Sequence, residues 1–367
     1  MSDKPPQIHV LLVDDSAVIR TAMKSLIEED PAITVIATAK NGEEAIKEAQ
    51  THKPHIIMLD VEMPVMDGIT ALPKVLEASP KSKVLMFSAL TEKGASVTMN
   101  ALSLGAIECV VKPAAGEARS GTSFHKALLI KIKAIVPARH RIGAKPVSTP
   151  APSIKAATPI HSPTGNFTLR NEPSDFKGKP DIILIGSSTG GPQALFNVTS
   201  HLTGLNIPIV ITQHMPATFT KILAEHIQEN SKIECHEAQD GMQLEAGKAY
   251  VAPGGKHMVF EKTPIGPNII RLNDGPAENF CKPAVDPMFR SALEVFDNRM
   301  VAVILTGMGQ DGLASARLIT EKGVRLVAQD EATSVVWGMP GNVAKEGLCS
   351  AVLPLDDIGP WIRNVAV

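Results

Sequence analysis

Residues 182–192 read IILIGSSTGGP, an apolar run that passes directly into a polar, glycine-rich turn. Four large apolar residues in a row, Ile182 to Ile185, are typical of a strand that is buried on both faces. The glycines allow a tight turn, and Pro192 suits the first position of a helix. The stretch therefore predicts a strand, a turn and a helix, which is the repeating unit of a parallel sheet.

The same alternation continues on the C-terminal side of this stretch. Further strands are predicted at Pro208–Thr212, Val301–Leu305 and Arg325–Ala328, and helices at Pro192–Leu202, Thr218–Glu229 and Asp311–Glu321. Three short segments follow one another with turns and no helical pattern between them: Lys248–Val251, His257–Glu261 and Asn268–Leu272. We expect a doubly wound parallel α/β domain, Rossmann-like, with a β-hairpin or meander inserted in it.

A second alternating region lies on the N-terminal side. Its predicted strands are His9–Val13, Ile33–Ala39, His55–Asp60, Lys83–Ser88 and Cys109–Lys112, with amphipathic stretches at Ala17–Glu28 and Gly42–Thr51. Between the two regions prolines recur amid Ser, Thr, Ala and Lys, which disfavours regular structure. We therefore expect one domain over 8–126, a proline-rich linker over 137–178 and a second domain over 179–367.

Composition limits the possible functions. The chain has 367 residues, of which 44% are hydrophobic and 20% charged, as in ordinary globular proteins. Its apolar runs are too short for a membrane span or a signal peptide, and its four cysteines are far apart, so we expect a cytoplasmic protein. Residues 179–367 carry 15 Lys and Arg against 20 Asp and Glu, which disfavours nucleic-acid binding.

Polar residues follow four strands of the N-terminal region. Asp14 and Asp15 end the first strand, Asp60 the third, Ser88 the fourth and Lys112 the fifth. Carboxyl ends of parallel strands meet at one sheet edge, where three carboxylates would repel one another without a cation. Mg²⁺ would relieve that repulsion, and Asp60 could attack a phosphoryl group. Any one of these residues alone could simply cap a helix or strand; four coincident strand ends argue against that.

The GSSTGGP turn offers a second site. Ser188 and Thr189 lie at a predicted helix N-terminus, His214 follows the next strand, and Asp311 follows the strand at 301–305. A hydroxyl, an imidazole and a carboxylate at one sheet edge are the parts of a nucleophilic triad. The alternatives are helix capping by the serines and phosphate binding in a dinucleotide fold, although the spacing is not GxGxxG.

The motifs LLVDDS, MLDVEMPVMDG and VVKP make residues 9–113 resemble a response-regulator receiver domain, whose fold is flavodoxin-like. The resemblance implies phosphorylation of Asp60, and Mg²⁺ binding by Asp14, Asp15, Asp60 and the carbonyl of Glu62. It implies that Ser88 and Lys112 sense the phosphoryl group, and that the Lys112–Pro113 bond is cis. Cys109 replaces the aromatic switch residue of many receivers, so coupling through an aromatic flip is not expected.

The motifs IGSSTGGP, ITQHMP, YVAPGGKHM, ILTGMGQDG and TSVVWGMP make residues 179–367 resemble the catalytic domain of CheB, the chemotaxis protein-glutamate methylesterase. The resemblance implies that Ser188 is the nucleophile, His214 the general base and Asp311 its orienting partner. Thr189 would assist at the nucleophile turn, and backbone near Met308 would line the oxyanion hole. Ser187 would act instead of Ser188 only if the register were shifted by one residue.

Together the two resemblances predict a phosphorylation-activated hydrolase of glutamyl methyl esters on chemoreceptors, which also deamidates receptor glutamines. The implied partners are a chemotaxis histidine kinase as phosphodonor and the receptors as substrate, with no nucleic acid, no membrane insertion and a monomeric state. The receiver would need Mg²⁺, and the esterase chemistry no cofactor. The rival predictions are a receiver with a DNA- or protein-binding output and a nucleotide-dependent oxidoreductase.

Overall fold

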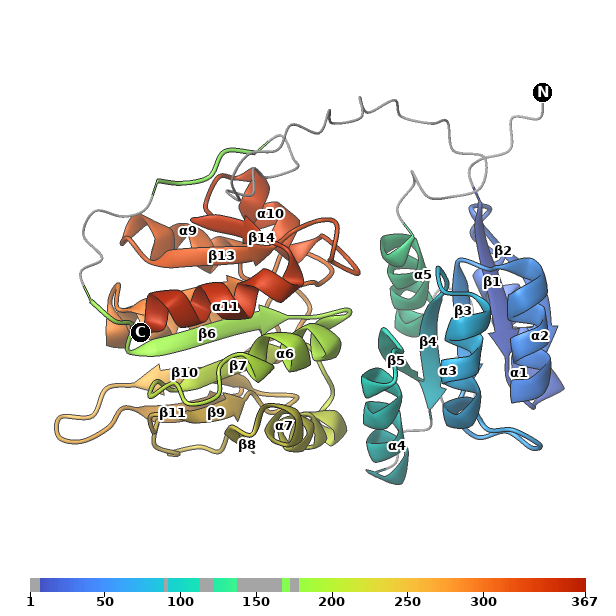
Figure 1. Ribbon diagram of the computed structural model, residues 1–367, viewed down its shortest axis with the longest axis horizontal. Helices are drawn as coiled ribbons and strands as arrows, with labels where there is room; N and C mark the ends of the chain where they lie inside the picture. The colour runs from blue at the N-terminus through green and yellow to red at the C-terminus, as the bar shows by residue number, and fades with distance from the viewer. Residues whose placement is uncertain (1–6, 89–91, 113–121, 137–166, 172–177) are drawn as a thin grey trace. The chain divides into compact units, whose positions relative to one another are not determined.

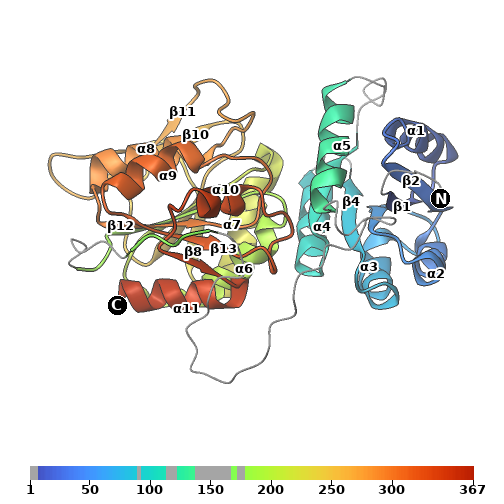
Figure 2. The same cartoon turned by 90° about the horizontal axis from the view of Figure 1, so that it is seen from above.

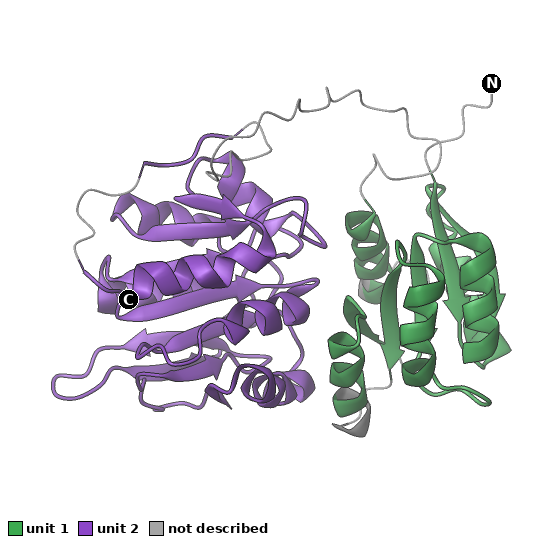
Figure 3. Ribbon diagram, in the orientation of Figure 1, with its two compact units in different colours: residues 1–160 green, residues 161–367 purple. Residues whose placement is uncertain are grey.

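The computed structural model describes residues 7–88, 92–112, 122–136, 167–171 and 178–367. The chain divides into two compact units, residues 1–160 and 161–367 (Figure 3). Within the described residues, no helix combines the length and the apolar character that crossing a bilayer requires.

The first unit is built on a five-stranded parallel sheet of order β2-β1-β3-β4-β5 (Figure 1). Its strands are β1 (Ile8–Val13), β2 (Ile33–Ala39), β3 (Ile56–Asp60), β4 (Lys83–Ser88) and β5 (Glu108–Val111). Helices α1 (Ala17–Ile27) and α5 (Ser123–Ile135) cover one face, and α2 (Gly42–His52), α3 (Gly68–Ala78) and α4 (Glu92–Ser103) the other (Figure 2). Ser16, and not Asp15, caps α1, since its side chain accepts from the backbone of Ile19.

The second unit is built on a seven-stranded sheet of order β14-β13-β12-β6-β7-β9-β8, in which every neighbouring pair is parallel. Its strands are β6 (Ile182–Ser187), β7 (Ile209–Gln213), β8 (Glu234–Glu237), β9 (Lys248–Val251), β12 (Met300–Ile304), β13 (Arg325–Gln329) and β14 (Ala351–Leu353). One face carries α6 (Gly191–Ser200), α7 (Ala217–Ser231) and α11 (Leu355–Ala366). The other carries α8 (Val285–Phe296), α9 (Leu313–Glu321) and α10 (Met339–Lys345) (Figure 2). The predicted fold class, two parallel α/β domains, is confirmed.

Of the two predicted forms of the insertion, hairpin or meander, the structure has the hairpin. Strands β10 (His257–Glu261) and β11 (Ile269–Asn273) form a two-stranded antiparallel ribbon, and β10 packs against α8. The expected third member, Lys248–Val251, instead joins the main sheet between β7 and β8. The burial of Ala249, Tyr250 and Val251 explains this difference, because a short strand buried on both faces belongs in the sheet interior.

Part of the segment predicted as linker packs on the second unit. The Arg170 backbone N–H donates to the Cys349 carbonyl at 2.9 Å, and the Phe167 ring lies 6.1 Å from the Trp337 ring. Phe167 and Leu169 also contact the hydrophobic core of this unit. The described residues 167–170 are therefore anchored by apolar contacts that proline content alone did not reveal.

Candidate active site and phosphoryl-accepting site

The residues of the predicted triad come from three adjacent parallel strands, β12, β6 and β7. Ser188 directly follows β6, His214 directly follows β7, and Asp311 lies in the segment between β12 and α9. The Ser188 backbone N–H donates to the Thr306 carbonyl at 3.0 Å, and the His214 N–H donates to the Ser187 carbonyl at 3.2 Å. The sheet thus brings residues that are far apart in sequence to one edge.

His214 and Asp311 form a close pair. Nε2 of His214 lies 2.7 Å from Oδ2 of Asp311, and the Asp311 side chain is almost fully buried. An ionised Asp311 accepts a hydrogen bond from Nε2–H, which leaves the lone pair of a neutral ring on Nδ1. The geometry therefore makes Nδ1 the nitrogen that could take a proton from a nucleophile.

Asp311 is held at the N-terminus of α8. Its carboxylate accepts from the backbone N–H groups of Val285 at 2.6 Å and Asp286 at 3.2 Å, and from Nδ2 of Asn279 at 3.1 Å. Burial alone would raise the pKa of Asp311, but His214 and these N–H groups outweigh it and hold the pKa below its usual value. A helix N-terminus favours the charged carboxylate in the same way.

A cysteine lies against the other nitrogen of the His214 ring. Sγ of Cys281 is 3.3 Å from Nδ1, and no hydrogen bond joins the Ser188 hydroxyl to the ring in the described part of the chain. Burial alone would lower the pKa of His214, but Asp311 and Cys281 outweigh it and raise the pKa to about 9. Ser188 and Cys281 must therefore share access to Nδ1.

The two neighbouring serines differ sharply in their surroundings. Ser187 is fully buried, and its hydroxyl donates to Oε1 of Gln213 at 2.6 Å. Nε2 of Gln213 donates in turn to the carbonyls of Ser188 at 2.9 Å and His214 at 3.2 Å. The Ser187 hydroxyl is thus used in a structural contact, whereas Ser188 is partly exposed, as a nucleophile must be.

The turn after β6 and the segment after β12 also present unused backbone donors. Neither Thr189 nor Met308 donates its backbone N–H to a protein acceptor among the residues that the structure describes. A Cβ atom on Gly307 would lie 2.9 Å from Cβ of Ser188, so these two segments are in close contact. Donors placed this near a nucleophile can stabilise a developing oxyanion.

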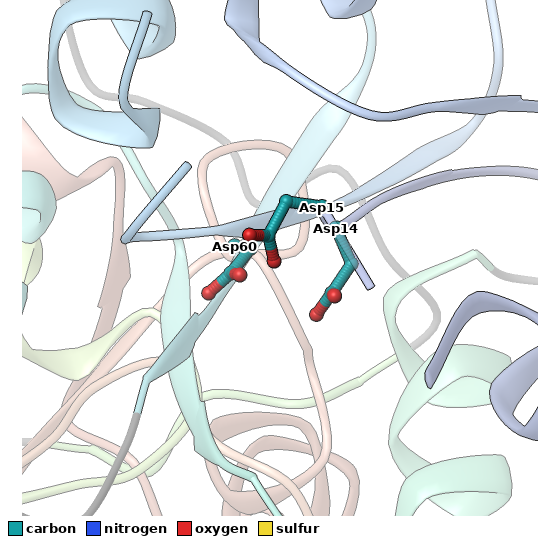
Figure 4. Close-up of side chains that lie close together, drawn as sticks. All are labelled: Asp14, Asp15 and Asp60. Carbon is teal, nitrogen blue, oxygen red and sulfur yellow. The ribbon is translucent and has the colours of Figure 1, made fainter. Parts of the chain in front are cut away.

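The acidic residues of the first unit gather as predicted. Asp14, Asp15 and Asp60 each offer a carboxylate oxygen, and these atoms lie within 4.8 Å of one another at the ends of β1 and β3 (Figure 4). Asp14 and Asp60 are buried, and Asp15 is exposed. Hard oxygen ligands in such a cluster fit Mg²⁺. Asp60 also has a backbone hydrogen bond with Glu62, whose side chain is exposed.

Lys112 neutralises part of this charge. Its Nζ lies 2.7 Å from Oδ2 of Asp60 and 2.9 Å from Oδ2 of Asp14. Burial raises the pKa of Asp60 to about 6, because Lys112 only partly offsets it and Asp14 adds to it. The buried Ser88 is the last residue of β4. Its carbonyl accepts a hydrogen bond from the Lys112 N–H at 2.8 Å, which holds the ends of β4 and β5 together beside Asp60.

Two further predictions concern β5. Cys109 lies where many receivers have an aromatic residue; its Sγ approaches the Thr98 carbonyl at 3.7 Å, and burial raises the pKa of its thiol. The predicted cis bond between Lys112 and Pro113 lies outside the described residues, because Pro113 is not among them.

Sequence reasoning missed α8 and the loop before it, which together hold Asp311 and His214. The apolar residues Val285, Met288, Phe289, Ala292 and Phe296 recur at helical spacing, and this pattern would have located α8. Cys281 had no comparable signal, since a single cysteine in a loop is most often a bystander.

The chain is similar to known proteins over both units. Residues 183–362 match the family model described as CheB methylesterase, and residues 10–119 match the response regulator receiver domain. The chain is 47% identical to a protein-glutamate methylesterase/protein-glutamine glutaminase of Paramagnetospirillum magneticum, over 98% of this chain and 96% of that protein. It is 48% identical to one of Azospirillum brasilense, over 98% and 93% respectively.

Among solved structures, the Thermotoga maritima CheB methylesterase catalytic domain is 37% identical, covering 51% of this chain and 99% of its own, with a TM-score of 0.49. The relatives decide the family membership of the whole chain, because the similarity extends over both units. The chain therefore belongs to the CheB methylesterase family, in the form that carries a response regulator receiver domain before the methylesterase domain.

Proposed function

We propose that this protein is a phosphorylation-activated hydrolase that removes methyl groups from glutamyl esters on chemoreceptors during chemotaxis adaptation. The names of the full-length relatives, protein-glutamate methylesterase/protein-glutamine glutaminase, support the reaction type. The same names support a second substrate, the side-chain amide of glutamine, whose hydrolysis would release ammonia instead of methanol.

The observation that carries the proposal is the hydrogen-bonded pair of His214 and Asp311 at the same sheet edge as the partly exposed Ser188. Ser188 Oγ attacks the ester carbonyl while Nδ1 of His214 takes its proton. The N–H groups of Thr189 and Met308 hold the oxyanion, and methanol leaves with the proton returned by His214. Water activated by the same nitrogen then hydrolyses the acyl-enzyme and frees Ser188.

In the regulatory unit, Asp60 accepts the phosphoryl group, and Ser88 and Lys112 contact its oxygens. Asp14, Asp15, Asp60 and the Glu62 carbonyl would hold Mg²⁺, which when bound neutralises the charge around the phosphoryl group. We assign the phosphodonor to a chemotaxis histidine kinase. We place the regulatory domain at 8–126 and the catalytic domain at 179–367, on either side of a linker over 137–178.

The test is methanol release from methylated receptor membranes, with and without a small-molecule phosphodonor. Ser188→Ala lowers the rate by at least roughly 10³-fold, whereas the matched control Ser187→Ala retains most of it. Asp60→Asn loses the stimulation by the phosphodonor. Wild-type release from Ser188→Ala would refute the nucleophile, and undiminished stimulation of Asp60→Asn would refute the phosphorylation site.

A further inference from the structure

Residues 278–281 form a tight hairpin turn beside the active site. The backbone N–H of Glu278 donates to the carbonyl of Cys281 at 3.1 Å, and the N–H of Cys281 donates back to Glu278 at 2.8 Å. The two residues between them, Asn279 and Phe280, have φ of 51° and 65°. Positive φ at both central positions defines a type I′ turn, in which asparagine is favoured at the first position and glycine at the second.

This turn is fastened to the catalytic pair at both corners. Nδ2 of Asn279 donates to Oδ1 of Asp311 at 3.1 Å and to Oδ2 of Asp286 at 2.9 Å. Sγ of Cys281 lies 3.3 Å from Nδ1 of His214. Glu278 forms a two-pronged ion pair with Arg290, at 2.6 and 2.9 Å. The position of the turn relative to the His214 ring is therefore fixed.

Phe280, at the tip of the turn, points into solvent. Its relative exposure is 103%, and it is the only aromatic among the large hydrophobic residues found exposed in the described ranges. A ring so exposed adds nothing to the core. Its backbone conformation is one that glycine adopts freely and a side chain does not. Isolated exposed apolar residues are common, but here the residue is both exposed and strained, one position from the cysteine that touches His214.

We propose that Phe280 is a specificity-determining residue that binds an apolar side chain of the substrate protein, next to the glutamate whose ester is cleaved. The inference rests on the proposed function. Phe280 directly precedes Cys281, whose Sγ contacts the His214 ring, so the Phe280 side chain projects from the turn that borders the catalytic pair. A substrate protein whose esterified glutamate lies at the His214 ring extends over this turn, so a residue near that glutamate can contact the Phe280 ring.

The experiment compares kcat and KM for methanol release from methylated receptor membranes in wild type, Phe280→Gly and Phe280→Tyr. Glycine removes the ring and is favoured at this position of the turn, so a rise in KM cannot be attributed to a damaged fold. We expect KM of Phe280→Gly to rise roughly tenfold, with kcat falling far less, because an interaction equal in ground and transition states is lost. Phe280→Tyr keeps the ring and restores KM to within about threefold of wild type.

Ile265 provides the matched control. It is another exposed apolar residue at 94%, and it lies in the turn between β10 and β11. Ile265→Ala retains the wild-type KM if the effect belongs to the Phe280 position and not to surface apolarity in general. Ser188→Ala in the same assay separates the two proposals. If Ser188→Ala is inactive while Phe280→Gly keeps the wild-type KM, the role of Phe280 is overturned and the proposed function stands.

Discussion

At the level of single residues, the His214 ring decides the orientation of the catalytic relay. Its Nε2 contacts Asp311 and its Nδ1 faces Cys281, so Nδ1 must serve Ser188. In the serine-protease arrangement the two nitrogens have the opposite roles. The thiol therefore contacts the nitrogen that would take up the proton, so it should change the pH dependence of the reaction.

Replacing Cys281 by alanine should shift the pH profile of kcat/KM. The base works only when neutral, so activity rises with pH through the pKa of His214, which is raised to about 9. Cys281 contributes to that rise, and without it the pKa of His214 falls and the half-maximal pH moves lower. Rates of methanol release between pH 6 and 10 measure the shift.

The matched control for this prediction is Cys235→Ala, which removes a thiol buried in β8. It should leave the half-maximal pH in place. A profile of Cys281→Ala that superimposes on the wild-type profile would show that the thiol does not influence the base.

Phe280 also makes a prediction about stability. Relief of the left-handed backbone in Phe280→Gly should raise the free energy of unfolding by about 0.5–1 kcal/mol, after the greater freedom of glycine in the unfolded chain is allowed for. Phe280→Ala keeps a side chain at the unfavourable φ, so its free energy of unfolding should not rise. Thermal melts of the full chain compare the two, and equal melting temperatures would argue against strain at this turn.

The sequence predicted which residues lie at one edge of the sheet but not what positions them. Ser188, His214 and Asp311 each follow a recognisable apolar strand, and the parallel topology brings them to one edge. Their catalytic roles stay predictions. Asn279 and Cys281 reach the same edge from an irregular loop, and its path depends on tertiary contacts with α8 that no local pattern encodes.

At the level of elements, the ends of β6 and β7 are tied by one side chain. Gln213 accepts from the buried Ser187 hydroxyl and donates to the Ser188 and His214 carbonyls. A Cβ on Gly191, at the start of α6, would lie 1.9 Å from Oε1 of Gln213, so this helix begins directly against it. The strand ends and the helix start are therefore a single packed unit.

Gln213→Leu should be strongly destabilising, because it leaves the Ser187 hydroxyl buried without an acceptor. We expect a loss of about 1–3 kcal/mol in the free energy of unfolding, measured by urea denaturation. Adding Ser187→Ala removes the orphaned hydroxyl and should recover part of that loss. A double variant no more stable than Gln213→Leu would mean that the two side chains are not coupled.

Some element boundaries were predicted correctly from the residue types alone. The strands predicted at 33–39 and 83–88 agree with β2 and β4: β4 contains a continuous buried run, and β2 is rich in β-branched residues. The edge strand β8 was missed because it reads Glu-Cys-His-Glu and has no apolar alternation. Lys248–Val251 was assigned to the hairpin because its partner β8, the preceding strand, was not recognised.

At the level of the whole molecule, the predicted phosphoryl-accepting site and the predicted hydrolase site are formed by residues of different units. The acidic cluster lies in the first unit, and the triad residues all lie in the second. Chelation of divalent cations with EDTA should therefore abolish the stimulation by a phosphodonor and leave the unstimulated rate of methanol release unchanged. Excess Mg²⁺ should restore the stimulation. A loss of the unstimulated rate that Mg²⁺ or Zn²⁺ restores would show that the esterase itself needs a metal.

The strand order of the second unit has a consequence for its folding during synthesis on the ribosome. β6 is the first strand of the second unit to leave the ribosome, yet it lies in the middle of the finished sheet. Asp311 emerges 123 residues after Ser188, a delay of about 6 to 25 seconds at ordinary translation speeds. The nascent chain thus contains Ser188 long before Asp311, the carboxylate that forms a hydrogen bond with the His214 ring. By then the first unit, which contains the receiver domain, has been synthesised in full. The receiver domain is therefore present before the methylesterase domain can complete its first reaction.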